Sequence, residues 1–309
     1  MGDCGFSSQG NQLESANIGG GTLYTLFSTH LMNQSEVVLN AISGGPTQML
    51  ENFEDILNDP EHKATIKNEQ RKTQQITHLV RQKKISWIGV EVSPLELEKG
   101  LKWEELVEDY NGMKSLLSEY ITDSNKMDKI LSLMYPPYVV AWAKNPKAFD
   151  SIKIVPIDDD AAKTESSRLV GEMDRARSEL IELGMKKRLL TPEQFFAIDE
   201  LRLKAMSEVR RITPEETRQT TSQFDNDEVK NVIEKLFSKW NEFYKNSEIR
   251  DATMARSVLN QSGDGLVVLG SAHGRGVVNH LNSYCQGNSS SPNETAPASG
   301  NSKTQSSDR

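Results

Sequence analysis

Short apolar runs alternate with longer amphipathic stretches along this chain. The runs at residues 22–27, 85–92, 152–157 and 266–269 have the length and the polar boundaries of buried strands. Between and after them, a helical period predicts helices at residues 36–83, 103–120 and 126–143, from about 162 to 258, and in a short closing segment after Val277. Strands that alternate with helices are typical of α/β proteins, so we predict a mainly parallel sheet flanked by helices.

The segment from about residue 161 to residue 212 differs from the rest, because its repeats are rich in charge and lie between two predicted strands. Thr191-Pro192 and Thr213-Pro214 are typical helix starts, with threonine as the N-cap and proline at the first helical position. They divide the region into predicted helices at 162–187, 192–211 and 214–246. We interpret 161–212 as a helical insertion whose helices pack together, with a lid that caps the sheet as the alternative.

Both ends of the chain are polar. Residues 1–17 are rich in Gly, Ser and Asn, and residues 286–309 contain almost no apolar side chain. Such segments bury too little apolar surface to offset the entropy lost on ordering. We therefore expect disordered tails on either side of a single domain at residues 18–285.

Composition limits the partners of the 309-residue chain. A net charge of -8 and the lack of a basic block argue against nucleic acid, which needs clustered Lys and Arg. No apolar stretch reaches the roughly 20 residues of a transmembrane helix, and the first residues do not resemble a secretory signal. The chain is expected to be cytoplasmic, or exported without a classical signal. Gly2 and Cys4 leave N-terminal acylation as a minor alternative, and the spacing of Cys4 and Cys285 indicates no disulfide framework.

A residue able to bind metal or move protons follows each predicted strand. These residues are His30, Glu91, Asp158 and His273. In a parallel sheet the carboxyl ends of the strands share one edge, where ligands bind. Any one of them alone is more often a structural polar group, but the recurrence at four strands predicts a shared site. It would be a Zn, Mn or Fe centre or a metal-free acid–base pair, with Asp158 as a binding residue.

The turn after the last strand is rich in glycine. Gly270, Gly274 and Gly276 allow close backbone approach, and Arg275 adds a positive charge that could hold an anion. We list Gly270, Gly274 and Arg275 as binding candidates. Upstream, Arg250 stands on a predicted helix with apolar residues at helical spacing, so it could point toward the sheet.

The segment from Arg250 to Leu281 resembles the C-terminal signature of the TraB, GumN and TIKI proteins. That signature is an arginine and a methionine on a helix, a strand, a GxxH turn, a Gly-Val pair and a helix. Leu26 to His30 resembles the first GxxH strand, with Phe27 in place of the glycine, and Gly89-Val90-Glu91 resembles the strand with the site glutamate. The superfamily includes erythromycin esterase-like and ChaN-like proteins and a domain of the Pasteurella multocida toxin, and the resemblance spans residues 22–283.

The resemblance implies a hydrolase, a peptidase or an esterase, acting on a peptide or a small ester. His30, Glu91 and His273 would bind a divalent ion such as Mn, Co or Zn, or would activate water without one, and Arg250 would stabilise the oxyanion. Phe27 is expected to narrow the approach to His30. The alternative is a non-catalytic toxin or effector domain that binds a protein target, and a third interpretation is a structural subunit whose polar strand ends cap the sheet.

Overall fold

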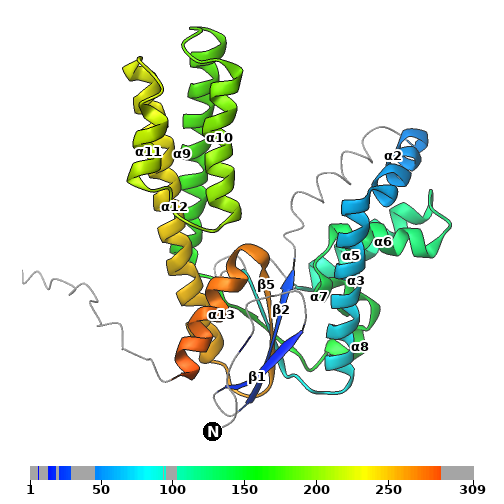
Figure 1. Ribbon diagram of the computed structural model, residues 1–309. Helices are drawn as coiled ribbons and strands as arrows, with labels where there is room; N and C mark the ends of the chain where they lie inside the picture. The colour runs from blue at the N-terminus through cyan, green and yellow to red at the C-terminus, as the bar shows by residue number, and fades with distance from the viewer. Residues whose placement is uncertain are drawn as a thin grey trace, which may run out of the picture.

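The structure is a computed structural model that describes residues 6, 13–18, 21–28, 46–92, 94 and 103–286. Five strands in these residues form one sheet with the order β1-β2-β5-β3-β4 (Figure 1). They are β1 (Glu14–Ile18), β2 (Gly21–Ser28), β3 (Trp87–Val90), β4 (Lys153–Pro156) and β5 (Gly265–Gly270). The pairs β2–β5, β5–β3 and β3–β4 are parallel, and β1–β2 is antiparallel. The sheet confirms the predicted α/β class and its mainly parallel strands.

β1 corrects the prediction that residues 1–17 are a disordered tail. Residues 14–17 belong to an edge strand, which pairs with β2 from Glu14 opposite Thr25 to Ile18 opposite Gly21. Only Gly19 and Gly20 separate the two strands in sequence, and a two-residue Gly-Gly connection is a hairpin signal that the composition of this segment concealed. The other residues of the two predicted tails, except Phe6, Leu13 and Gln286, lie outside the described residues.

The sheet is buried on both faces because its central strand is apolar on both sides. In β5, Leu266 and Val268 face one hydrophobic core, and Val267 and Leu269 face the other. This alternation follows from the two-residue period of a strand. The result is a layered arrangement in which helices cover each face of the sheet.

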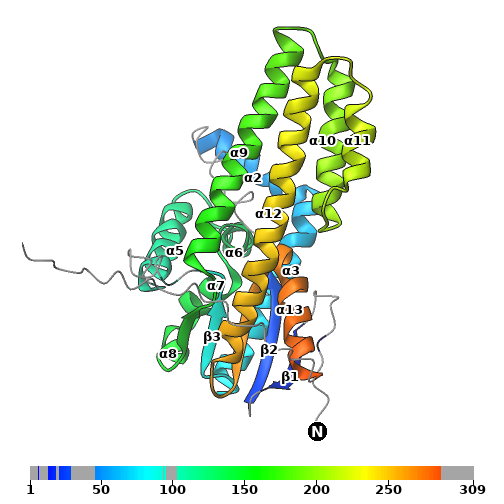
Figure 2. The ribbon, with the colours of Figure 1, turned by 90° about the vertical axis from the view of Figure 1, so that its left-hand side faces the viewer.

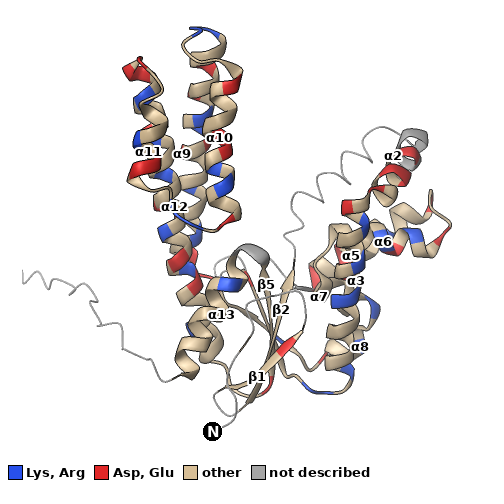
Figure 3. Ribbon diagram, in the orientation of Figure 1, with Lys and Arg blue, Asp and Glu red and all other residues tan. Residues whose placement is uncertain are grey.

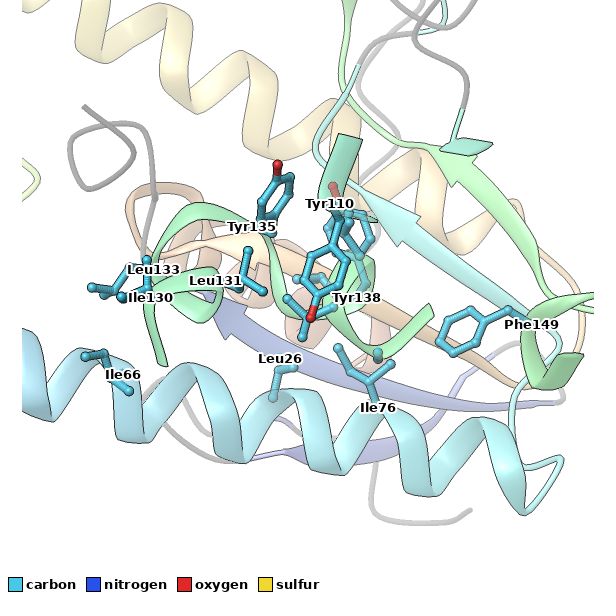
Figure 4. Close-up of a cluster of buried hydrophobic side chains, with 14 of the residues drawn as sticks. Leu26, Ile66, Ile76, Tyr110, Ile130, Leu131, Leu133, Tyr135, Tyr138 and Phe149 are labelled. Atoms are coloured by element: carbon cyan, nitrogen blue, oxygen red, sulfur yellow. The ribbon is translucent and has the colours of Figure 1, made fainter. Parts of the chain in front are cut away.

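The larger core lies between the sheet and the helices that precede β4. These are α2 (Pro46–Asn58), α3 (Pro60–Arg81), α5 (Trp103–Ser118), α6 (Ser124–Met134), α7 (Pro137–Lys144) and the short α8 (Pro146–Phe149). Figure 4 shows Leu26 of β2 among Ile76 of α3 and Tyr138 of α7. Tyr135 and Tyr138, which flank the two prolines between α6 and α7, are buried here, as expected for packing residues.

The opposite face is covered by α12 (Asp227–Leu259) and α13 (Ser271–Cys285). The predicted closing helix begins earlier than expected, because α13 starts directly after Gly270, its N-cap, instead of after Val277. The turn that the glycines suggested is therefore the first part of a helix. Cys285, at the end of α13, is disulfide-bonded, which contradicts the expectation from cysteine spacing.

Four helices project from the sheet as a helical arm, formed by α9 (Asp160–Met185), α10 (Pro192–Ser207), α11 (Pro214–Thr221) and the first half of α12 (Figures 1 and 2). The arm has its own apolar core, which includes Leu180, Ile198 and Phe237. The helix predicted at 214–246 is wrong as one unit: α11 ends at Thr221, and Asn226 caps a new helix. Thr191 and Thr213 form the capping boxes that the sequence indicated.

Candidate functional site

Four of the five residues predicted to be catalytic or to follow a strand meet at the carboxyl edge of the parallel strands. Glu91 follows β3, Asp158 follows β4, Arg250 stands on α12, and His273 lies in the first turn of α13. The fifth, His30, lies outside the described residues. The sheet order places β3 between β5 and β4, so three neighbouring strand ends contribute to one cluster.

Arg250 joins two of the carboxylates. Its Nε lies 3.1 Å from Asp158 Oδ1 and its Nη2 lies 2.5 Å from Asp158 Oδ2, so the guanidinium grips this carboxylate with two hydrogen bonds. The same Nη2 lies 3.4 Å from Glu91 Oε1. The Asp158 side chain is completely buried and that of Arg250 is 10% exposed, which makes this an interior ion pair.

His273 lies between Glu91 and a third carboxylate, Asp251. Its Nδ1 is 2.5 Å from Asp251 Oδ1, and its Nε2 is 3.5 Å from Glu91 Oε1. A carboxylate on one ring nitrogen fixes the orientation of the ring and leaves the other nitrogen for chemistry. Asp251, His273 and Glu91 therefore form a continuous row of acid and base groups that ends at the strand edge.

Burial and charge shape the ionisation of this cluster. Burial raises the pKa of Asp251, while its hydrogen bond to His273 and the charge of that histidine act in the opposite direction. Burial lowers the pKa of Arg250, but the hydrogen bond and charge of Asp158 outweigh this effect and raise it above its ordinary value. Burial also raises the pKa of the Tyr138 hydroxyl, and the charge of Glu91 adds to this shift. Arg250 therefore stays charged beside its two carboxylates.

Among the described residues, the side chains at the strand ends bond to one another and also accept two backbone N–H groups. Gly270 donates its N–H to Glu91 Oε2 at 2.9 Å, and Asp159 donates its N–H to Asp158 Oδ1 at 2.8 Å. A sheet edge capped only for structural reasons would show mostly backbone partners. The side-chain network instead resembles the mutual orientation that functional sites require.

Two glycines of α13 allow the close packing around this cluster. A Cβ atom on Gly276 would lie 1.8 Å from Asp251 Oδ2, so only glycine allows α12 to bring its carboxylate this close. A Cβ atom on Gly274 would lie 2.7 Å from the Phe27 ring. Neither glycine forms the anion-binding turn expected from sequence, because both lie inside the helix.

Arg275 lies apart from the buried cluster. Its side chain is exposed on α13 and lines a pocket of about 430 Å³ together with Tyr244, Asp251 and His280. The structure thus brings Gly270 into the cluster through its N–H and leaves Arg275 at a neighbouring pocket.

The described part of the chain provides only two donors for the expected metal ion. Glu91 Oε1 and His273 Nε2 converge, but no group of three described His, Cys, Asp or Glu residues could hold a metal. A divalent ion usually takes at least three protein ligands, and the guanidinium of Arg250 at 3.4 Å would repel a second cation. The third expected ligand, His30, lies outside the described residues, so the metal centre stays a prediction.

Sequence reasoning missed two parts of this edge. Asp251 was overlooked beside Arg250, although Met254 and Val258 follow it at helical spacing and mark a buried face. A second buried cluster lies at the end of β2: Ser28 donates a hydrogen bond to Glu69 of α3 at 3.0 Å, and Glu69 pairs with Lys72 at 2.6 Å. Ser28 is paired in register with Gly270, so the cluster adjoins the site. Its only sequence signal is a Glu and a Lys, three apart, on the apolar face of a helix.

A comparison with known protein families, with curated proteins and with solved structures finds no match for this chain. The resemblance to the TraB, GumN and TIKI proteins therefore stays a prediction, based on the residues alone. Among the described residues, none of the helices combines the length and the apolar character needed to span a membrane.

Proposed function

We propose that this protein is a hydrolase that works by acid–base catalysis without a metal ion. The observation that supports it best is the row formed by Asp251, His273 and Glu91, with the imidazole 2.5 Å from one carboxylate and 3.5 Å from the other. This is the geometry of an oriented general base. The substrate class is an ester or an amide, because their hydrolysis needs only an activated water and a stabilised oxyanion.

Each residue has a defined role in this mechanism. Asp251 holds the Nδ1–H of His273 and stabilises the imidazolium that forms when Nε2 takes a proton from water. Glu91 accepts the other hydrogen of that water, because two acceptors 3.5 Å apart can share one water at about 2.8 Å from each. His273 then returns its proton to the leaving group.

Arg250 supplies the positive charge of the site. Its Nε and Nη2 are occupied by Asp158 and Glu91, while its Nη1 makes no hydrogen bond with any residue that the structure describes. The guanidinium can therefore stabilise a developing oxyanion without releasing Asp158. Asp158 is a positioning residue, which keeps the guanidinium at the end of β4.

The experiment is a hydrolysis assay of the full chain with nitrophenyl esters of increasing acyl length and with a fluorogenic peptide library, before and after treatment with EDTA. We expect turnover that survives EDTA, no stoichiometric metal by mass spectrometry, and losses of about 10²–10⁴-fold in kcat/KM for His273→Ala and Asp251→Asn. His78→Ala, an exposed histidine on α3, is the control and should leave activity unchanged.

Three outcomes would overturn the proposal. Activity that requires a bound ion would instead support the predicted metal centre of His30, Glu91 and His273. Unchanged turnover in His273→Ala would remove the general base. A folded chain without turnover on any ester or peptide would favour the non-catalytic binding domain.

A further inference from the structure

The outer surface of the helical arm is unusually apolar. Eleven large hydrophobic side chains are exposed among the described residues, and six of them belong to α9 and α10. These six define the outer face of the arm: Val170, Ile181, Met185, Phe196, Leu203 and Met206. Surface helices normally place polar residues on the side away from the core, so a concentration of this kind marks a contact surface.

α10 is apolar on two opposite sides. Ile198 and Ala205 face the core of the arm, whereas Phe196, Leu203 and Met206 are exposed on the outer face. Phe196 and Leu203 are seven residues apart, which places them on the same side of the helix two turns from one another. A helix with this pattern is typically packed on both sides, and only one side is packed within this chain.

The outer face continues from α10 onto α9 without a gap. Ile181 and Met185 of α9 line an apolar pocket of about 290 Å³ together with Phe196 of α10. Met185 is 79% exposed and Phe196 is 68% exposed at this pocket. Asp199 of α10 links the two helices by accepting a hydrogen bond from Arg177 of α9 at 3.2 Å, and it accepts another from Arg202 of its own helix at 2.9 Å.

Charge along α10 indicates what covers this face. The exposed acidic residues of α10 are Glu193 in its first turn and Glu200 in its middle, and Lys204 is an exposed cation about one turn beyond Glu200. Figure 3 shows acidic and basic residues along this helix. Neither Glu200 nor Lys204 has an ion-pair partner within the described part of the chain. Opposite charges four residues apart on a helix each meet their counterpart on an antiparallel copy when the two-fold axis lies between them.

We propose that the outer face of the arm is a homodimer interface in which α10 packs antiparallel on α10 of a second copy. A two-fold axis beside Arg202 brings Glu200 of each copy opposite Lys204 of the other. It also places Leu203 at the centre of the contact and Phe196 near the turn of the second copy that contains Met206. α10 has 16 residues, about 24 Å in length, and the pocket residues of α9 widen the contact beyond a single helix.

The test is the association of the full chain, measured by sedimentation velocity and light scattering over a wide concentration range. We expect a wild-type dimer whose Kd rises at least about tenfold in Leu203→Glu. Leu116→Glu on α5 is the matched control, because Leu116 is 43% exposed and Leu203 is 44% exposed. The control should dimerise like the wild type, and circular dichroism checks that each variant is folded.

Charge-reversal variants distinguish the antiparallel α10–α10 pairing from nonspecific association through apolar side chains. Glu200→Lys and Lys204→Glu should each raise the Kd about tenfold, and the double variant should restore it, since the reversed charges again meet across the axis. A wild-type monomer at all concentrations would overturn the proposal. So would binding of the monomer to lipid vesicles through Leu203, equal effects of the two leucine substitutions, or a double variant no better than the singles.

Discussion

Arg250→Met tests whether the ion pair at the strand edge is a requirement of the fold. The substitution keeps most of the side-chain length and removes the guanidinium, so Asp158 loses two charge-assisted hydrogen bonds at 3.1 and 2.5 Å. The Asp158 side chain has no exposed surface, so water cannot replace the lost partner. Breaking one side of a buried ion pair costs about 3–5 kcal/mol, because the remaining charge stays buried without its partner.

A surface pair provides the control for this magnitude. Arg218 Nη1 and Glu215 Oε2 are 2.8 Å apart, but their side chains are 72% and 58% exposed. Arg218→Met should therefore cost no more than about 1 kcal/mol, although the contact is equally short. The comparison isolates the effect of burial from the effect of distance.

The assay is urea unfolding followed by the fluorescence of the four tryptophans, with the midpoint and the slope fitted for each variant. Arg250→Met together with Asp158→Leu should recover at least half of the loss, because the unpaired carboxylate is gone. The reasoning is refuted by a loss below about 1 kcal/mol in Arg250→Met, or by a double variant less stable than the single one.

Three further predictions concern the packing and ionisation of the site. Gly276→Ala should destabilise the fold by about 1–3 kcal/mol, because the added Cβ would lie 1.8 Å from Asp251 Oδ2. The control is Gly171→Ala on α9, which has open space around it and should stabilise the fold by about 0.5–1 kcal/mol. Thermal unfolding of the two variants compares these effects. Gly274→Ala should destabilise through the Phe27 ring, and adding Phe27→Leu should return part of the stability; an equal loss with and without Phe27→Leu would contradict this contact. The pKa of Asp251 is raised above 3.8 in the fold, so the stability from its protonated form is present at lower pH and is lost as pH rises through the folded-state pKa. Asp251→Asn lacks this titration, so its free energy of unfolding should increase relative to that of the wild type as pH rises above 3.8. Urea unfolding at a series of pH values measures this difference.

The sequence is sufficient to predict the central strands β3 and β5 because they are buried on both faces. A strand such as Leu266 to Leu269 must be apolar at every position, which makes it visible as a continuous run. β1 lacks this signal because it is an edge strand with partly exposed positions and one buried apolar residue, Ala16. β1 forms because it pairs with β2, and this pairing is a tertiary contact that the residues of β1 alone do not indicate.

The boundaries of helices were predictable where capping chemistry is local, and not where it depends on neighbours. Thr191 and Thr213 form capping boxes within four residues, so both helix starts were found. α13 instead begins at Gly270 without any side-chain cap, and the N–H of that glycine bonds to Glu91 of another strand. Gly270, Gly274 and Gly276 fall within seven residues and disfavour a helix by propensity alone, so tertiary contacts decide that α13 starts there.

In the candidate site, too, the residues at the strand ends were predictable from the sequence, but the partners that bind them were not. The position of Glu91 and His273 after strands predicted that they share an edge, and the structure places them 3.5 Å apart. The partner of the other imidazole nitrogen was not predictable, because Asp251 reaches it from a helix packed across Gly276. That contact depends on how two helices cross, which no local pattern encodes.

Phe27 illustrates how a departure from an expected motif is accommodated. The sequence suggested that this bulky residue, where the resemblance expects glycine, narrows the approach to the strand edge. Adjacent residues of a strand point to opposite faces, and Ser28 points toward Glu69 of α3, so the ring of Phe27 points toward α13. There it lies against Gly274, whose missing side chain makes room for it. The ring of Phe27 therefore fills the space between β2 and α13 that a side chain at position 274 would occupy.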